Sequence, residues 1–330
     1  RARHGGRVSA RRRIVLDTDM GTDADDALCL ALALAAPELD VAAVTTVSAD
    51  TRRRAAIARR LLDLAGRSDV PVHAGLAAPR TPDATFLWLG DEGDFLLERD
   101  ATVAGIAAEP AVDALIRMLH AEDGLELVAV GPLTNLAAAI ERDRSIARRI
   151  ACLTIMGGHI RRVAYGAHEF PHGVDYNLCS DAQASQIVLS SGMPIRLVTA
   201  DVTLATWLRP DDLATIEAVP TPFHAAIAGA IRAWTPHMRD IFGGMGAPIG
   251  PHNVAFLHDP LALACAYDES FCGFEDLAIE PSLGDGPFRT IARAAASPAT
   301  RAMRCATTVD AERFRRHFVD RIVHFRRDPR

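Results

Sequence analysis

Short apolar runs alternate with helix-like segments through the first 200 residues, and this alternation constrains the fold more than any other feature of the sequence. The apolar runs, each of strand length, are Ile14–Leu16, Val41–Val47, Val70–His73, Leu125–Val130, Cys152–Met156 and Ile195–Val198. The helical patterns between them include Thr51–Ala65, Pro110–His120, Leu133–Ile140 and Asp181–Ser190. Strands joined by helices in this way pair in parallel, so the sequence predicts an α/β, Rossmann-like fold with a mostly parallel central sheet flanked by helices. Ligands of such sheets bind beyond the carboxyl ends of the strands.

The chain becomes more helical after residue 200. Helices are predicted at Pro210–Ala218, Phe223–Arg239, Asp259–Tyr267 and Ala311–Phe325, with a hairpin at Leu277–Ile291 whose turn contains Gly284 and Gly286. We expect these segments to form a helical C-terminal lobe on one domain spanning 13–330. We expect the basic residues 1–12 to form a disordered arm.

Five aspartates crowd the turn after the first apolar run, in the segment IVLDTDMGTDADDAL at 14–28: Asp17, Asp19, Asp23, Asp25 and Asp26. Carboxylates this close raise one another's pKa unless a positive charge lies between them. Oxygen ligands suit a hard divalent cation, Ca²⁺ or Mg²⁺, better than zinc. An acidic helix N-terminus would explain Asp25 and Asp26 but not Asp17 and Asp19 upstream. We therefore expect a cation-dependent active site on this turn.

Composition excludes several other classes of protein. The net charge of -6 and pI near 6.1 give no electrostatic case for nucleic acid or an anionic membrane as a partner. All 36 basic residues are Arg, so chemistry that needs Lys, such as Schiff-base formation, is excluded. The six cysteines contain no C-x-x-C pair and are expected to be free thiols in a reducing compartment. With no apolar run of membrane-spanning length and no apolar segment after the basic N-terminus, we expect a soluble, cytoplasmic protein.

Polar residues also follow other predicted strands. Asp50 ends TTVSAD, Asn135 lies in VAVGPLTNLA, Asp175 and Asn177 lie in VDYNLCSDAQA, and His258-Asp259 opens LHDPLALA. Each of these segments could be a turn or a helix cap alone, since Asp before Pro at a helix start is a common cap. In the alternative interpretation, Asp259 joins the metal cluster and His258 donates a proton to a leaving group.

The segments DTDMGTDADDAL, VAVGPLTNLA, IMGG, DYNLCSDAQA and LHDPLALA, in this order and spacing, resemble the inosine-uridine preferring nucleoside hydrolases. The resemblance covers about residues 13 to 270. It implies a Ca²⁺-dependent ribosidase that cleaves the N-glycosidic bond of nucleosides, and a homodimer or homotetramer.

The resemblance also implies roles for individual residues. Asp19 would bind the metal and act as general base, with Asp25, Asp26, Asp259 and the Val130 carbonyl as further metal ligands. His258 would be the acid for the departing base. The ribose contacts would come from Asp25, Asp50, Asp175 and Asn177.

The chain departs from the family pattern in the sugar contacts. The acidic turn has two extra residues, so Asp23 and Asp25 compete for one role. Asp50 replaces an Asn, Asp175 replaces a Glu, and the loop at 158–174 is long and has no matching Asn. A binding protein without turnover, or a hydrolase of another N-riboside, therefore stays open as an alternative.

The sequence does not indicate a preferred base. Trp88 lies in a loop where relatives place active-site residues and could stack on a base, whereas Trp234 is expected to be a packing residue. Gly243, Gly244 and Gly246 indicate a mobile segment before His258, suited to a lid.

Two other metal-dependent classes fail on single residues. A haloacid-dehalogenase-type phosphatase needs a downstream Lys, which the chain lacks. An EF-hand loop counted from Asp17 would place Thr22 where Gly is required and Leu28 where Glu is required.

Overall fold

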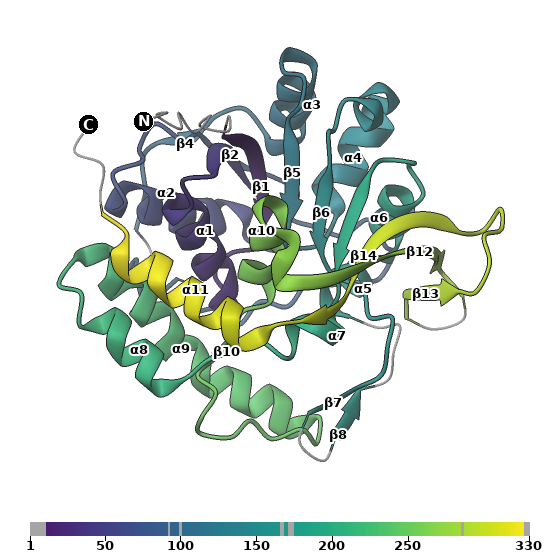
Figure 1. The fold of residues 1–330 in the computed structure, drawn as a ribbon. Coiled ribbons are helices and arrows are strands. Elements are labelled where there is room, and N and C mark those ends of the chain that lie inside the picture. The colour runs from purple at the N-terminus through teal and green to yellow at the C-terminus, as the bar shows by residue number, and fades with distance from the viewer. Residues whose placement is uncertain are drawn as a thin grey trace, which may run out of the picture.

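The computed structural model describes residues 11–91, 93–98, 101–165, 168–170, 175–284 and 287–326. A ten-stranded sheet runs through the molecule in the order β13-β12-β14-β9-β6-β5-β1-β2-β3-β4 (Figure 1). Its strands are β1 (Arg12–Thr18), β2 (Leu39–Thr46), β3 (Val72–Ala74), β4 (Ile106–Ala107), β5 (Glu126–Ala129), β6 (Leu153–Met156), β9 (Ile195–Val198), β12 (Cys272–Ser282), β13 (Arg289–Arg293) and β14 (Arg301–Val309). Neighbouring strands from β14 to β4 pair in parallel, and only β12 pairs antiparallel, with β13 and with β14. The predicted mostly parallel α/β sheet is confirmed.

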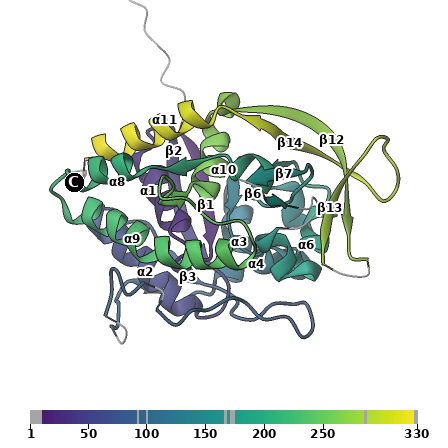
Figure 2. The same ribbon diagram turned by 90° about the horizontal axis from the view of Figure 1, so that it is seen from below.

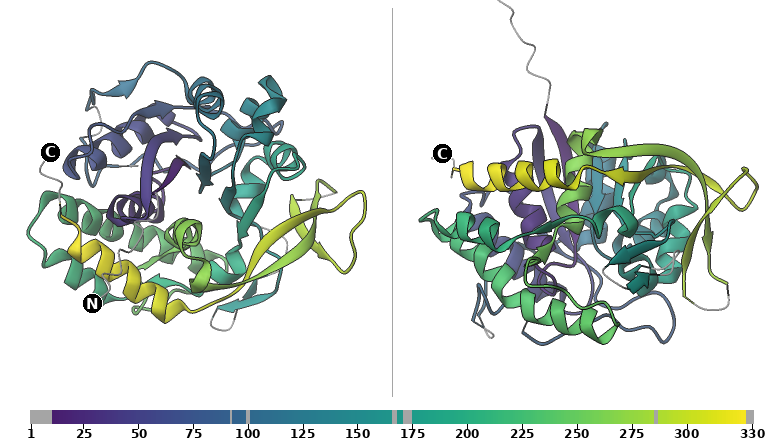
Figure 3. Two further views of the ribbon diagram at one scale, coloured as in Figure 1. Left: turned by 45° about the horizontal axis from the view of Figure 1, so that its top comes forward. Right: turned by 60° about the horizontal axis from the view of Figure 1, so that its bottom comes forward.

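Helices cover both faces of this sheet (Figures 2 and 3). The helices are α1 (Asp25–Ala35), α2 (Thr51–Leu64), α3 (Ala111–Ala121), α4 (Thr134–Arg142), α5 (Tyr176–Ser180), α6 (Ala182–Leu189), α7 (Ala200–Thr203), α8 (Pro210–Glu217), α9 (Pro222–Gly244), α10 (His258–Tyr267) and α11 (Ala311–His324). Short 3-10 turns lie at Arg144–Arg148 and Glu269–Phe271, and two small hairpins pair β7 (Val163–Tyr165) with β8 (His168–Phe170) and β10 (Trp207–Leu208) with β11 (Ala255–Phe256).

Successive side chains of β1 point to opposite faces of the sheet, and the core accordingly has two layers. Ile14 and Leu16 pack with α1, α2 and α8 to α11, whereas Val15 packs on the opposite face with α3, α4 and α6. In Figure 3 the yellow α11 and the green α8 and α9 lie together on one side of the strands. Because the strands are buried on both faces, they read as continuous apolar runs.

The C-terminal part combines helices with strands. The predicted hairpin forms as β12 and β13, with Gly284 at its turn; Gly286 lies outside the described residues. The sequence did not predict β14, which pairs with β9 and so joins the hairpin to the central sheet. Along β14 the buried Met303 and Cys305 flank the exposed Arg304, a pattern too short to distinguish from a loop.

The N-terminal boundary differs slightly from the prediction. β1 begins at Arg12, which forms an ion pair with Glu126 on β5, so this residue belongs to the sheet and not to the expected arm. Residues 1–10 of that arm lie outside the described residues. In the described part of the chain, no helix is both long and apolar enough to cross a membrane.

The parallel strands bring several loops to one edge of the sheet. The acidic turn follows β1, Val130 follows β5, Gly157 follows β6 and Thr199 follows β9. Residues distant in the sequence therefore meet at this edge, as the rule for open α/β sheets requires.

Candidate active site

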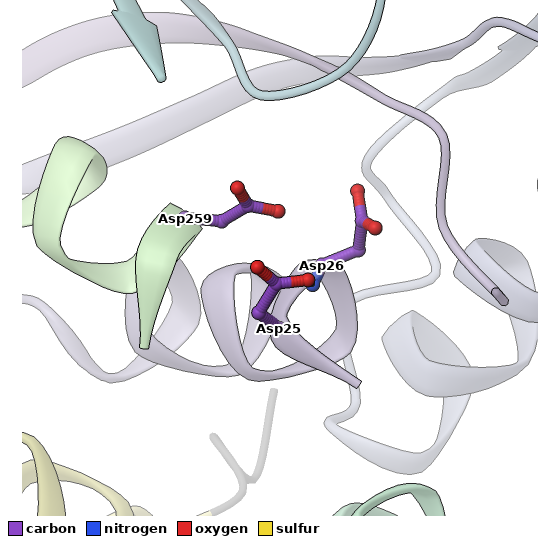
Figure 4. A group of neighbouring side chains, drawn as sticks. All are labelled: Asp25, Asp26 and Asp259. Carbon is purple, nitrogen blue, oxygen red and sulfur yellow. The ribbon is translucent and has the colours of Figure 1, made fainter. Parts of the chain in front are cut away.

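Three buried carboxylates meet where the N-termini of two helices approach each other. Asp25 and Asp26 occupy the first turn of α1, and Asp259 the first turn of α10. One oxygen from each lies within 4.8 Å of the others, and Figure 4 shows the Asp259 carboxylate directed toward the α1 pair. The positive ends of two helix dipoles favour anionic groups here.

Burial and mutual repulsion make this cluster a site for a cation. The pKa values of Asp25, Asp26 and Asp259 are raised well above their ordinary range, first by burial and then by the neighbouring carboxylates. A hard divalent ion would offset both effects, and an all-oxygen donor set suits Ca²⁺ or Mg²⁺. The residues present therefore fit the metal that the sequence predicts.

Asp19 lies beside this cluster and lines the same cavity. A Cβ added to Gly131 would come within 2.6 Å of Asp19 Oδ1, so the glycine of GPLTN is needed for the approach of this carboxylate. Burial raises the pKa of Asp19, and the Arg54 guanidinium opposes that shift.

Asp17, the first aspartate of the turn, has a supporting position. It does not belong to the cavity lining, and its Oδ1 accepts hydrogen bonds from Thr45 at 2.5 Å and Asn135 at 2.8 Å. Burial raises its pKa to about 7. Asp17 thus ties the end of β1 to β2 and to the start of α4.

Val130 and Asn177 also line the cavity and are hydrogen-bonded to each other. The Asn177 Nδ2 donates to the Val130 carbonyl at 2.7 Å and to the Met156 carbonyl at 3.1 Å. Asp175 lines the same wall and caps α5 by accepting from the Leu178 amide at 3.0 Å, and burial raises its pKa to about 6. The structure therefore brings both predicted sugar-contacting residues of this segment to the cavity that Asp25, Asp26 and Asp259 line.

Two residues predicted to contact substrate are placed outside the cavity lining. Asp50 is exposed and caps α2, where its carboxylate accepts from the Arg53 amide at 2.9 Å. The left-handed backbone at Ser48 (φ 78) and Ala49 (φ 52) produces this placement, because it turns the chain before Asp50. Trp88 is half-buried with the Arg54 guanidinium 5.0 Å from its ring centroid, while its neighbour Leu87 lines the cavity.

His258 lines the cavity next to Asp259 on α10. Its Nδ1 lies 2.7 Å from the Thr203 hydroxyl, and its ring stacks on Phe256 with centroids 4.9 Å apart. Burial lowers the pKa of His258 to about 4, so the imidazole is neutral at pH 7.

An apolar wall of the cavity is formed by α9 and by Met245, the residue that follows it. Trp234, Ile241, Phe242 and Met245 line it, so Trp234 is not only the packing residue that the sequence predicted. Its indole is 7% exposed, and Nε1 has no hydrogen-bond partner among the described residues. The predicted glycines lie at the end of this wall: Gly243 and Gly244 are in α9, and Gly246 follows with φ 80.

The whole cavity has a volume of about 890 Å³. Its lining consists of Asp19, Thr22, Asp23, Asp25, Asp26, Leu87, Val130, Met156, His159, Asp175, Tyr176, Asn177, Cys179, Ser180, Ala200, Leu204, Trp234, Ile241, Phe242, Met245, His258 and Asp259. One end can hold a cation and hydroxyl groups, and the other can hold a flat apolar group.

Two supporting residues were missed from the sequence. Thr203 holds the His258 ring, and the fully buried Arg54 lies behind Asp19. Arg54 is one of three consecutive arginines, and helical spacing alone does not tell which of them points inward.

The chain is similar in sequence and in fold to known nucleoside hydrolases. The family model "Inosine-uridine preferring nucleoside hydrolase" matches residues 14–316. A pyrimidine-specific ribonucleoside hydrolase, RihA, of Shewanella sp. (strain MR-4) is 32% identical over 262 residues, 77% of each chain. A purine-preferring ribonucleoside hydrolase from Gardnerella vaginalis has 26% identity and a TM-score of 0.80, with 95% of this chain and 98% of that chain covered. A plant nucleoside hydrolase, PpNRh1, shares the fold with a TM-score of 0.81 at 24% identity, over 95% of this chain and 99% of the other.

Proposed function

The chain belongs to the inosine-uridine preferring nucleoside hydrolase family and is an N-glycosyl hydrolase, and from this premise we propose that it uses Ca²⁺ to hydrolyse nucleosides to free base and ribose. The observation that carries the proposal is the meeting of Asp25, Asp26 and Asp259 beside Asp19 at one end of the cavity. A carboxylate-rich end and an apolar end match the two halves of a nucleoside.

The proposed metal ligands are the carboxylates of Asp19, Asp25, Asp26 and Asp259 and the carbonyl of Val130. The hydrogen bond from Asn177 does not exclude the carbonyl, because a carbonyl oxygen has two lone pairs. Ribose hydroxyls would complete a shell of about 6–8 oxygens.

Asp19 is the proposed general base. A divalent cation held by these residues would supply an oriented water molecule of lowered pKa. The Asp19 carboxylate then takes the proton as the water oxygen attacks the anomeric carbon, through an oxocarbenium-like transition state. Asp175 and Asn177 would bind the ribose hydroxyls and hold the sugar against the water.

His258 is the proposed acid for the departing base. The Thr203 hydroxyl and the Phe256 ring fix its imidazole in the cavity wall. Burial lowers its pKa to about 4, so the imidazole is neutral at pH 7 and would first take up a proton from solvent, which it then gives up readily and so returns to its neutral form. The leaving nitrogen of the base would receive that proton.

The charges on the cavity favour a neutral substrate. Six carboxylates, from Asp19, Asp23, Asp25, Asp26, Asp175 and Asp259, and no Arg occur among the described residues that line it. The two positive charges of a bound Ca²⁺ would offset only part of the charge of six carboxylates, so a phosphate group would meet repulsion with no Arg in the described lining to bind it. We therefore propose nucleosides, not nucleotides, as substrates.

A hydrolase of another N-riboside is the second candidate. The observation that favours it is the outward position of Asp50, which leaves one of the expected ribose contacts unfilled.

One experiment tests the substrate class. Release of free ribose is measured from uridine, cytidine, inosine and adenosine, from their 5′-monophosphates, and from nicotinamide riboside, with Ca²⁺ present. We expect release from at least one nucleoside and none from the monophosphates. Release from nicotinamide riboside alone would support the second candidate, and preferential release from a monophosphate would contradict the charge argument.

Location and assembly are further parts of the proposal. All six cysteines are free thiols, which supports a reducing, cytoplasmic location. The family membership supports a homodimer or homotetramer, and light scattering of the purified protein tests it.

A further inference from the structure

The buried guanidinium of Arg54 donates hydrogen bonds to the acidic turn, residues 19–24. Arg54, in the first turn of α2, is fully buried. Its Nη1 donates to the carbonyls of Asp19 and Met20, the latter at 3.1 Å, and its Nη2 donates to the Thr22 hydroxyl at 3.1 Å. A single guanidinium thus donates to three residues of the turn.

The same guanidinium joins this turn to two other segments. Nε donates at 2.8 Å to the carbonyl of Ser48, in the left-handed bend that follows β2. The ring of Trp88 covers it at 5.0 Å. Burial of an Arg is costly unless its donors are satisfied, so a charge held mainly by main-chain carbonyls indicates a precise geometric role.

The turn that Arg54 holds carries the residues of the proposed chemistry. Asp19 and Thr22 both line the cavity, and the six residues 19–24 belong to neither a helix nor a strand. A long turn has more backbone freedom to lose, so its ordering needs additional contacts. The planar fork of Arg, with five donors, is suited to several carbonyls at once, and the single ammonium of Lys is not.

We propose that Arg54 is a positioning residue, which clamps the long acidic turn so that the Asp19 carboxylate is presented to the metal cluster and to the reacting water. The proposal rests on the function proposed above for Asp19. In this proposal Arg54 affects metal binding through the position of Asp19, and its own side chain is not a metal ligand.

Arg59 provides a matched control on the same helix. Its side chain is 3% exposed, and it also donates to main-chain carbonyls, those of Val70 at 2.7 Å and Arg67 at 3.0 Å. None of its acceptors lines the cavity. A purely structural role for Arg54 therefore predicts that the two arginines behave alike.

The experiment compares Arg54→Met, Arg54→Lys and Arg59→Met in the full chain. Amide hydrogen exchange over residues 19–24 is measured on metal-free protein, Ca²⁺ affinity by titration calorimetry, and kcat and KM at saturating Ca²⁺. We expect both Met variants to lose thermal stability. Only the Arg54 variants should exchange faster over the turn, bind Ca²⁺ more weakly and lose at least about tenfold in kcat, with a smaller change in KM.

Unchanged exchange and Ca²⁺ affinity in both Arg54 variants, or equal changes in Arg59→Met, would overturn the proposal. If the Arg54 variants do not fold, Thr22→Val removes one acceptor at the cavity edge, and the same rise in exchange is expected from it; no rise would count against the clamp. Exchange and Ca²⁺ binding need no turnover. A wild-type protein that releases no sugar would therefore refute the proposed function and leave the clamp to be judged on these two readouts.

Discussion

The carboxylate of Asp19 packs against the backbone of Gly131: a Cβ at position 131 would lie 2.6 Å from Asp19 Oδ1 and 3.0 Å from the Asp19 amide nitrogen. The strand-end loops after β1 and β5 are thus in direct contact. The GPLTN segment thus contributes to the site by leaving room for Asp19, in addition to the role proposed for the carbonyl of Val130, the residue before it.

Gly131→Ala should therefore displace Asp19 without disturbing the rest of the fold. We expect kcat to fall by at least about tenfold, because a displacement of about 1 Å at a reacting group has effects of this size. Steady-state kinetics and a thermal melt measure both effects. Gly229→Ala is the control, since its Cβ would meet Phe95 only at an ordinary 3.6 Å; an equal loss in both variants would contradict the steric account.

The Trp234 indole should contribute to binding of the base. Trp234→Phe keeps an apolar ring but removes the unpartnered N–H, so KM should rise by about two- to tenfold if that N–H donates to the base. Trp234→Ala should raise KM further by removing the ring. Met238→Leu, a buried position on α9 outside the cavity lining, serves as control. Wild-type KM values in both Trp234 variants would remove this residue from base recognition.

The increase in thermal stability that Ca²⁺ gives the protein should depend on pH. In the metal-free protein, burial raises the pKa of Asp17 and Asp23 from 3.8 to about 7. Between these pH values the folded state binds more protons than the unfolded state, so the free energy of unfolding of the metal-free protein falls as the pH rises from about 4 to 7. Burial and mutual repulsion also raise the pKa values of the proposed ligands Asp25, Asp26 and Asp259, so Ca²⁺ competes with protons at these carboxylates. The increase in Tm on adding Ca²⁺ should be larger at pH 8 than at pH 5, and an increase that is equal or larger at pH 5 would contradict this coupling.

His258→Ala should slow substrates with poor leaving groups most, because only these need a proton on the departing base. We expect a loss of about a hundredfold or more on inosine or uridine and little loss on a nitrophenyl riboside. Thr203→Val, which removes the hydroxyl beside Nδ1, should give a smaller loss of the same kind. Equal losses on both substrate types would count against acid catalysis by His258.

The sequence predicted that the carboxylates of Asp25, Asp26 and Asp259 meet, because two independent patterns agreed. The apolar run before Asp17 places the aspartates at the carboxyl end of a strand, and the parallel sheet then brings the start of α10 to the same edge. Asp25, Asp26 and Asp259 follow from those two facts and from the family resemblance.

Side-chain direction could not be predicted in the same way. Counting residues from Asp26 placed Asp50 at a ribose contact. In the structure two left-handed residues precede it, and its carboxylate caps the N-terminus of α2. Trp234 was predicted to be a packing residue, and it is buried on α9, but the sequence cannot tell a buried face that packs on the core from one that borders a cavity. The inward position of Arg54 likewise depends on tertiary contacts with the acidic turn and Trp88.

The measurement that tests the central claim most directly is ribose release by metal-stripped protein as Ca²⁺ is added stepwise, run in parallel on wild type and Asp19→Asn. We predict no release from stripped wild type, recovery that saturates as Ca²⁺ binds, and a loss of about a hundredfold or more in a folded Asp19→Asn protein at every Ca²⁺ concentration. Full release from stripped wild type, or wild-type release from Asp19→Asn, would contradict the account.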